Sequence, residues 1–328
     1  MKLKSVLAAG ILFMSMTANA VDIIIYEAGG INPISGLGNS KGKLVLINGE
    51  KAGNPWKRLT MSEDSIHADK SLRLVSDFFT KESGRKSYDG RGSKIEAVTR
   101  VGRGFIDLLG FRQNAAWDGT KFLFGDGEKD GLTGLTDAID VIAHEYTHAI
   151  VQTSTKIDRN GQSGALNEHL ADVFGQYAQV KTGRGQKDFL IGETLMSPEM
   201  RAAATKRLGF KPLGMRDMLN PGKSFDPQPA EMKQIPKELG PNCKPSLLEN
   251  DLCGAHLLSG IPNRAISLTI QKLGWDKVAH VLYVVMTERL PKNPSFADYA
   301  SETISECGRQ LSSSECAAFD EGFKAVGL

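Results

Sequence analysis

His144-Glu145-Tyr146-Thr147-His148 is the most informative segment of the sequence. The apolar residues around it recur at steps of three and four behind Thr136 and Asp137, which predicts a helix capped at those two residues. Residues four apart lie on one face of a helix, so both imidazoles can reach one ion. Imidazole nitrogen is a preferred ligand of Zn²⁺, and the spacing therefore predicts a zinc site.

A third ligand and a base complete the predicted site. Glu145 is placed to take a proton from a water molecule that the metal activates. Glu168 lies on a second predicted helix, 20 residues past His148, and supplies the third ligand of a catalytic zinc site. Asp172, one turn further on the same face, is predicted to accept the outward N–H of a ligand histidine. His169 points about 100° around that helix and is interpreted as non-ligating.

The two segments together resemble the signature of the thermolysin-like neutral zinc metallopeptidases, a gluzincin family. H-E-x-x-H occupies residues 144–148 and G-x-x-N-E-x-x-x-D occupies residues 164–172. The resemblance covers roughly residues 65–328. It implies an α+β fold of two domains, one β-rich and N-terminal, the other mainly helical and C-terminal, with the zinc site in the cleft between them. It also implies that the ligands are His144, His148 and Glu168.

The same resemblance assigns further roles. Asn114 and the backbone of Ala115 match an edge strand that holds the substrate chain, and Arg216 matches an arginine that binds a substrate carbonyl. Asp251 and His256 match an Asp–His pair whose histidine donates to the transition-state oxyanion. Apolar residues occupy the positions of the family's specificity pocket, which implies cleavage before apolar side chains: Leu132, Leu135, Val141 and Met215.

Two features depart from the family pattern. The family's oxyanion tyrosine aligns with Arg159, so either Arg159 replaces it as donor, or a local gap shifts the alignment, or activity is reduced. Asp140, Asp188 and Glu193 keep carboxylates of the family's double calcium site, whereas Gln179 and Leu190 do not. Because Ca²⁺ needs six to eight oxygens, a paired calcium site is not expected and one weaker calcium is the most that these residues predict.

The order of segments predicts a leader and two domains. Residues 1–20 combine a lysine-containing start, an apolar run and Ala18-Asn19-Ala20, which is typical of a secretory signal peptide cleaved after Ala20. Residues 21–152 are predicted to form the β-rich domain, which ends in the H-E-x-x-H helix, and residues 153–328 the helical domain. Strands are predicted at 23–25 and 43–47, a surface excursion over 209–250, and helices over 69–81, 164–181, 254–273, 275–288, 296–308 and 315–325.

We interpret the four cysteines as disulfide-bonded because the predicted signal peptide directs the chain to an oxidising compartment. Their number is even, and spacings of ten and nine residues suit two local loops, 243–253 and 307–316. Connectivity does not follow from sequence alone. Neither pair has C-x-x-C spacing, so we interpret both as structural staples.

Composition and net charge limit the class of protein and the kinds of molecule that it is expected to bind. The chain has 328 residues, of which 41% are hydrophobic and 24% charged, and this balance excludes disordered and collagen-like proteins. Lys and Arg exceed Asp and Glu by 40 − 38 = 2, and both surplus lysines lie in the first four residues. The rest of the chain therefore has no net charge, and we expect it to bind neither nucleic acid nor an anionic membrane. We expect a monomer that binds protein or peptide substrates.

Two functions from different classes remain open at this point. The first is a secreted or periplasmic zinc endopeptidase. The second is an exported zinc-binding protein that has little or no proteolysis and acts by binding a partner. Glu145 and His256 favour the first, because a binding module needs neither of them, whereas Arg159 is the main support for the second.

Overall fold

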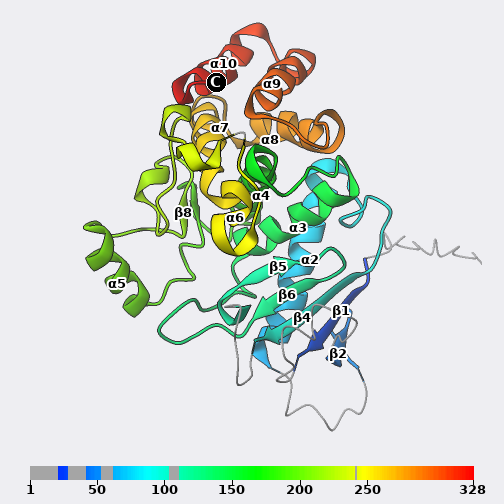
Figure 1. The fold of residues 1–328 in the computed structure, drawn as a ribbon. Coiled ribbons are helices and arrows are strands. Elements are labelled where there is room, and N and C mark those ends of the chain that lie inside the picture. Colours follow the sequence, from blue (N-terminus) through cyan, green and yellow to red (C-terminus); the bar gives the residue numbers. More distant parts are fainter. Residues whose placement is uncertain (1–20, 29–41, 53–61, 103–110, 241) are drawn as a thin grey trace, which may run out of the picture.

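The computed structural model describes residues 21–28, 42–52, 62–102, 111–240 and 242–328, and the predicted signal peptide lies outside them. Figure 1 shows a sheet at one end of the molecule, helices at the other, and α3 and α4 between them. Among the described residues, no helix is both long and apolar enough to span a membrane.

The N-terminal part is built on a mixed six-stranded sheet with the order β3-β2-β1-β4-β6-β5. Strand β1 pairs antiparallel with β2 and parallel with β4, and β5 pairs antiparallel with β6 at the sheet edge. Both predicted strands are present, and the predicted helix 69–81 lies within the longer α2, which begins six residues earlier. The elements are β1 Ile23–Glu27, β2 Lys43–Ile47, β3 Glu50–Lys51, α2 Glu63–Ser83, β4 Ile95–Val101, η2 Phe111–Gln113, β5 Ala115–Trp117, β6 Phe122–Gly125 and α3 Ile139–Thr153.

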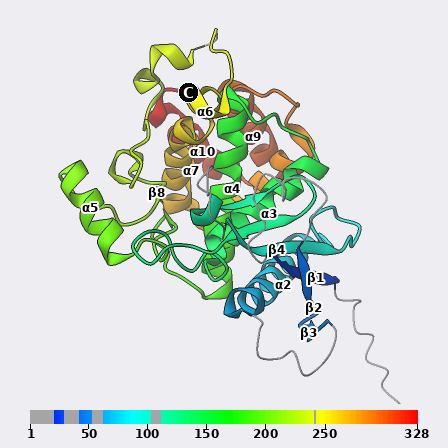
Figure 2. The same ribbon diagram turned by 60° about the horizontal axis from the view of Figure 1, so that its bottom comes forward.

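The C-terminal part is mainly helical and packs around α4, which contacts α3, α6, α7, α8 and α9 and runs through the middle of the molecule (Figures 1 and 2). Helix α5, which was not predicted, stands away from the body in both views and buries only Ala204. The elements are α4 Gly161–Thr182, β7 Leu190–Ile191, α5 Pro198–Leu208, β8 Arg216–Asp217, η3 Pro221–Lys223, η4 Met232–Gln234, η5 Lys237–Leu239, α6 Leu247–Leu258, α7 Gly260–Leu273, α8 Trp275–Val284, η6 Val285–Arg289, α9 Phe296–Gln310 and α10 Ser313–Val326.

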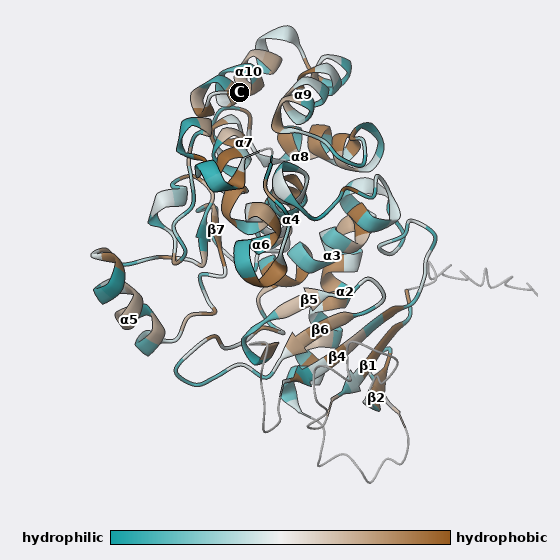
Figure 3. Cartoon of the chain, viewed as in Figure 1, coloured by the Kyte–Doolittle hydropathy of each residue, from teal (hydrophilic) through white to brown (hydrophobic). Residues whose placement is uncertain are grey.

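Tyr146 anchors α3 between the sheet and α2. Its ring is fully buried and stacks on Phe79 of α2, with centroids 5.3 Å apart, and on Phe122 of β6, with centroids 5.8 Å apart. Figure 3 shows that the strands of the sheet and much of α8 carry apolar residues. Tyr146, the central residue of the H-E-x-x-H segment, therefore belongs to the core. His144, Glu145 and His148 face away from this core and line the cleft described below.

Two sequence-based expectations about helix ends were wrong. Helix α3 is capped by Ala138 without a side-chain hydrogen bond, because Asp137 instead pairs with His67 at 2.8 Å. The predicted helix 254–273 is two helices that meet at Ser259. Pro262 has no N–H to donate to the carbonyl of Leu258, so one continuous helix would lack that hydrogen bond.

The predicted cysteine pairs are confirmed. Cys243 is bonded to Cys253 and Cys307 to Cys316. The first disulfide joins the loop before α6 to the interior of that helix, and the second joins α9 to α10. Both are local, as the spacings of ten and nine residues indicated.

Gly175 sets how closely α3 and α4 approach, and we predict that its substitution destabilises the fold. An added Cβ would lie 2.5 Å from the carbonyl oxygen of Asp140. Gly175→Ala should therefore lower the free energy of unfolding by about 1–3 kcal/mol, the usual cost of overpacking. Gly308→Ala is the matched control, because this exposed glycine in α9 has no atom within 4 Å of the added Cβ and should gain about 1 kcal/mol. Equal urea midpoints for the two variants would contradict the prediction.

Candidate metal centre and catalytic cleft

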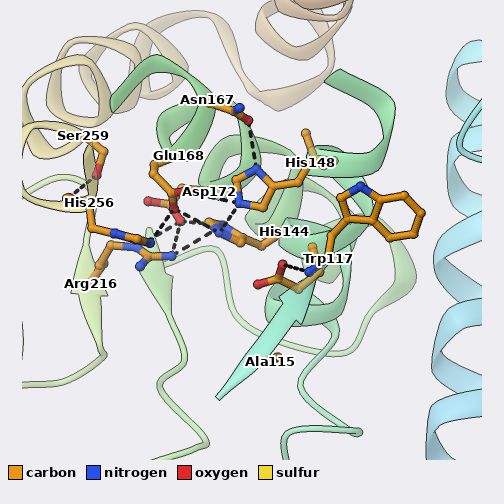
Figure 4. Close-up of polar contacts among 12 residues, drawn as sticks. Ala115, Trp117, His144, His148, Asn167, Glu168, Asp172, Arg216, His256 and Ser259 are labelled. Carbon is orange, nitrogen blue, oxygen red and sulfur yellow. Dashed lines mark hydrogen bonds and ion pairs between the residues drawn. The ribbon is translucent and has the colours of Figure 1, made fainter. Parts of the chain in front are cut away.

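Two helices bring the predicted zinc ligands together. The Nε2 atoms of His144 and His148, one turn apart on α3, lie 3.0 Å from each other. Glu168 on α4 places Oε2 3.3 Å from His144 Nε2 and Oε1 3.4 Å from His148 Nε2. Figure 4 shows the three side chains converging from the two helices. Among the described residues, they are the one group of His, Cys, Asp or Glu that is close enough to hold a metal ion.

The outer nitrogens of both histidines have partners that orient the rings toward this point. His144 Nδ1 lies 3.0 Å from Asp172 Oδ1, and His148 Nδ1 lies 2.8 Å from Asn167 Oδ1. Both partners are oxygen acceptors, so each Nδ1 carries the hydrogen and each Nε2 presents a lone pair. Sequence reasoning found the role of Asp172 but assigned none to Asn167, although Asn167 stands in the signature at residues 164–172.

The arrangement fits a cation. In these tautomers two Nε2 lone pairs and the Glu168 carboxylate face one another, and Oε2 of Glu168 is buried and accepts no hydrogen bond within the described residues. Such an unsatisfied buried acceptor is costly unless it binds a cation. Two imidazoles and one carboxylate match the ligand set of a catalytic zinc ion. His169 belongs elsewhere, because it is buried between Asn263 and Tyr299.

Asp172 joins four parts of the chain. Its side chain is fully buried on α4, where Oδ1 accepts from His144 and from both Nε and Nη2 of Arg216, at 3.0 and 2.6 Å. Its Oδ2 accepts from Asn263 of α7 at 2.8 Å. Burial alone would raise the pKa of Asp172, but the positive charge of Arg216 and the hydrogen bonds lower it to about 2. The carboxylate therefore stays ionised and fixes the His144 ring.

Glu145 lies beside the metal centre and faces the sheet edge. Its Oε2 accepts the backbone N–H of Trp117 in β5 at 2.8 Å. Burial raises the pKa of Glu145 to about 7. A carboxylate with a pKa near neutrality can accept and release a proton at physiological pH.

His256 approaches from α6 on the opposite side of the centre. Its Nδ1 is bonded to Asp251 Oδ1 at 2.6 Å, and its Nε2 lies 3.5 Å from Glu168 Oε2. The negative charge of Glu168 and the contact with Asp251 raise the pKa of His256 to about 9, against the effect of burial. The predicted Asp–His pair is therefore formed, and its Nε2 faces the carboxylate of Glu168.

A cleft of about 530 Å³ is lined by the three predicted zinc ligands, Glu145, Asn167, Arg216 and His256, but not by Asp172 or Asp251. Asn114 and Ala115 line it from β5, and the Asn114 side chain accepts the N–H of Ala115 at 2.9 Å. Arg159 lines it beside His148, and Arg216 lines it while bound to Asp172. The four predicted apolar pocket residues are also in its wall: Leu132, Leu135, Val141 and Met215.

The residues predicted to keep part of a calcium site do not form a compact group of ligands. Asp140 Oδ2 accepts the N–H of Gly192 at 2.6 Å, and Glu193 Oε1 accepts the amide of Gln179 at 2.6 Å. Asp188 accepts a backbone N–H at 3.1 Å. Glu193 Oε2 is buried and has no hydrogen-bond partner among the described residues, and a single calcium here stays a prediction.

Comparisons with known proteins agree with this geometry. Residues 18–152 match the family described as thermolysin metallopeptidase, catalytic domain, and residues 156–328 match thermolysin metallopeptidase, alpha-helical domain. The chain belongs to the thermolysin family of metallopeptidases. It is therefore a zinc metalloendopeptidase, and the implied α+β two-domain fold is confirmed. The predicted boundary between residues 152 and 153 stays a prediction.

Individual thermolysin-family relatives are similar over most of this chain. The extracellular metalloprotease of Pectobacterium carotovorum subsp. carotovorum is 31% identical over 88% of this chain and 77% of its own length. The extracellular elastase of Staphylococcus epidermidis is 33% identical over 71% of this chain, which spans only 40% of that protein. The solved precursor of protealysin, a metalloproteinase from Serratia proteamaculans, superimposes with a TM-score of 0.75 at 28% identity, covering 94% of this chain and 88% of that one.

Proposed function

We propose that this thermolysin-family chain is an exported endopeptidase that cuts peptide bonds on the amino side of apolar residues. One observation carries the proposal: a buried group of three metal-binding atoms lies in one cleft with Glu145, a free sheet edge and an apolar wall. This arrangement supports a separate role for each of these residues in binding the metal, transferring the proton or holding the substrate.

His144, His148 and Glu168 would hold the zinc ion. When bound, zinc polarises both a water molecule and the carbonyl of the scissile bond. Asp172 and Asn167 keep both histidines in the tautomer that presents Nε2 to the metal.

Glu145 is proposed as the general base. Its carboxylate lies one residue from the first ligand, is bonded to the backbone of Trp117, and has its pKa raised by burial to about 7. It takes a proton from the attacking water and returns it to the departing amine. Proton transfer by a positioned carboxylate is most efficient when the pKa of that carboxylate lies near the working pH.

The free edge of β5 is proposed to bind the substrate backbone. Gly125 N–H donates to the carbonyl of Asn114, so that carbonyl points toward β6, whereas the backbone groups of Ala115 point away from it. Trp117 confirms this alternation, because its N–H donates into the cleft to Glu145. An extended peptide could therefore add to this edge by donating to the carbonyl of Ala115, and a peptide carbonyl would displace the Asn114 side chain from the N–H of Ala115.

Three cationic or polar side chains surround the position of the substrate carbonyl. His256 is proposed to donate from Nε2 to the oxyanion, and Asp251 holds its ring. Arg159, which is exposed in the cleft wall, is proposed as the second donor in place of the family's tyrosine. Arg216 has Nη1 without a hydrogen bond among the described residues, and we propose that this nitrogen binds a substrate carbonyl.

Export and partners follow from several weaker observations. The predicted signal peptide, the two disulfides and the extracellular relatives support a secreted or periplasmic enzyme. Proteins or peptides are the proposed partners, and a monomer remains the expected state. The alternative of a binding protein without proteolysis gains no support, because Glu145 and His256 are both in place.

We predict that Glu145→Gln keeps the zinc and the fold but abolishes turnover. An amide cannot take the proton, and a general base contributes about 10²–10⁴-fold to the rate. Zinc content, melting temperature and kcat on a furylacryloyl dipeptide would be measured together. Glu199→Gln, an exposed glutamate at the start of α5, is the matched control and should be unchanged. Near wild-type kcat for Glu145→Gln would rule out this residue as the base.

We predict that Arg159→Ala lowers kcat on the order of 10²-fold with little change in KM, because loss of one oxyanion donor acts on the transition state. Arg159→Tyr should retain activity, since a phenol also donates. Arg184→Ala, an exposed arginine after α4, controls for lost charge. A neutral Arg159→Ala variant would show that His256 acts alone.

A further inference from the structure

Four consecutive residues within α6 have a left-handed backbone. Asp251, Leu252, Cys253 and Gly254 have φ of 51°, 52°, 64° and 79°, with ψ between 33° and 48°. Left-handed conformations are disfavoured for residues that carry a Cβ, and such residues rarely follow one another. Three of these four carry a Cβ. A turn of this kind persists only where the surrounding structure holds it.

One side of this left-handed turn is tied to the loop before α6. Cys253 is buried and disulfide-bonded to Cys243. The Asn250 side chain adds to the tie, because Oδ1 accepts the N–H groups of Cys253 and Ser246, each at 2.9 Å, and Nδ2 donates to the carbonyl of Lys244 at 3.0 Å. The disulfide is the one covalent link in this set.

The other side of the turn positions the Asp–His pair. Asp251, the first left-handed residue, accepts the backbone N–H groups of His256 and Leu257 at Oδ2, at 2.8 and 3.3 Å, and His256 Nδ1 at Oδ1, at 2.6 Å. Its carboxylate therefore both caps the following right-handed turn and fixes the imidazole ring. Any rotation of the backbone at 251–254 would move that carboxylate and, with it, His256 Nε2.

We propose that the Cys243–Cys253 disulfide is a positioning element for catalysis, because it holds the left-handed turn that aims His256 at the substrate carbonyl. This inference rests on the proposed role of His256 as an oxyanion donor. The Cys307–Cys316 disulfide, by contrast, joins α9 to α10, and neither of these helices contributes a residue to the cleft, whereas α6 does. The two disulfides should therefore differ in what their removal changes.

Three double variants test the proposal. Cys243→Ser/Cys253→Ala removes the bond and leaves a residue that disfavours the left-handed backbone. Cys243→Ser/Cys253→Gly removes the same bond but leaves a residue that adopts positive φ freely. Cys307→Ser/Cys316→Ser is the matched control for the loss of a disulfide elsewhere. For each, kcat, KM, zinc content and melting temperature are measured on a furylacryloyl dipeptide.

The alanine variant should lose about tenfold or more in kcat, up to the 10²–10³-fold that one oxyanion donor supplies, with KM within about twofold and zinc retained. The glycine variant should recover most of that kcat. The control should keep kcat, even where its melting temperature falls. An alanine variant with wild-type kcat, a glycine variant no better than alanine, or a loss that follows zinc content or melting temperature would overturn the proposal.

A second readout separates this inference from the proposed function. Long-range ¹H–¹⁵N spectra of the imidazoles, with His256 assigned through His256→Ala, report the contact between Nδ1 and Asp251 without any turnover. The His256 signal should shift in the alanine variant and return in the glycine variant. If the wild type hydrolyses no peptide, the proposed function fails, while this pattern would still support the positioning role. An unshifted His256 signal in the alanine variant would refute the positioning role whatever the activity.

Discussion

Two imidazole lone pairs and a buried carboxylate face one another at 3.0–3.4 Å, and the rest of the site is arranged to keep them there. Such acceptors repel one another unless a cation lies between them. The histidines cannot turn away, because Asp172 and Asn167 hold their outer nitrogens. Asp172 is in turn fixed by Arg216 and by Asn263, so β8 and α7 support a centre whose ligands come only from α3 and α4.

Helix α3 serves the core and the site at once. Tyr146 packs between α2 and β6, which turns His144, Glu145 and His148 toward the cleft. The same packing brings the edge strand β5 beside Glu145, where the N–H of Trp117 reaches the carboxylate. The proposed base, the two histidines proposed as zinc ligands and the edge that would bind the substrate backbone therefore lie on elements that pack against one another, and such pre-organisation is what a catalytic site requires.

Sequence alone predicted the features that follow from helical spacing. The steps of four residues between His144 and His148, and between Glu168 and Asp172, place side chains on one face wherever the helices lie. Short spacings likewise predicted both disulfides. The sequence did not reveal the roles of Asn167 and Asn263, because each depends on how two helices pack, and Asn263 lies 91 residues from Asp172 in the chain. It also missed the division at Ser259 and the left-handed turn at 251–254, since tertiary contacts there override the local preference for a right-handed helix.

The central claim is that the three facing acceptors bind one zinc ion, and the most direct test locates the metal. Crystals of the purified protein would be measured at energies just above and below the zinc absorption edge. The account predicts one anomalous peak, about 2.0–2.2 Å from His144 Nε2, His148 Nε2 and a Glu168 oxygen, with a fourth position open toward the cleft. A zinc peak bound by other residues, or well-ordered Nε2 atoms without a metal between them in zinc-saturated crystals, would contradict it.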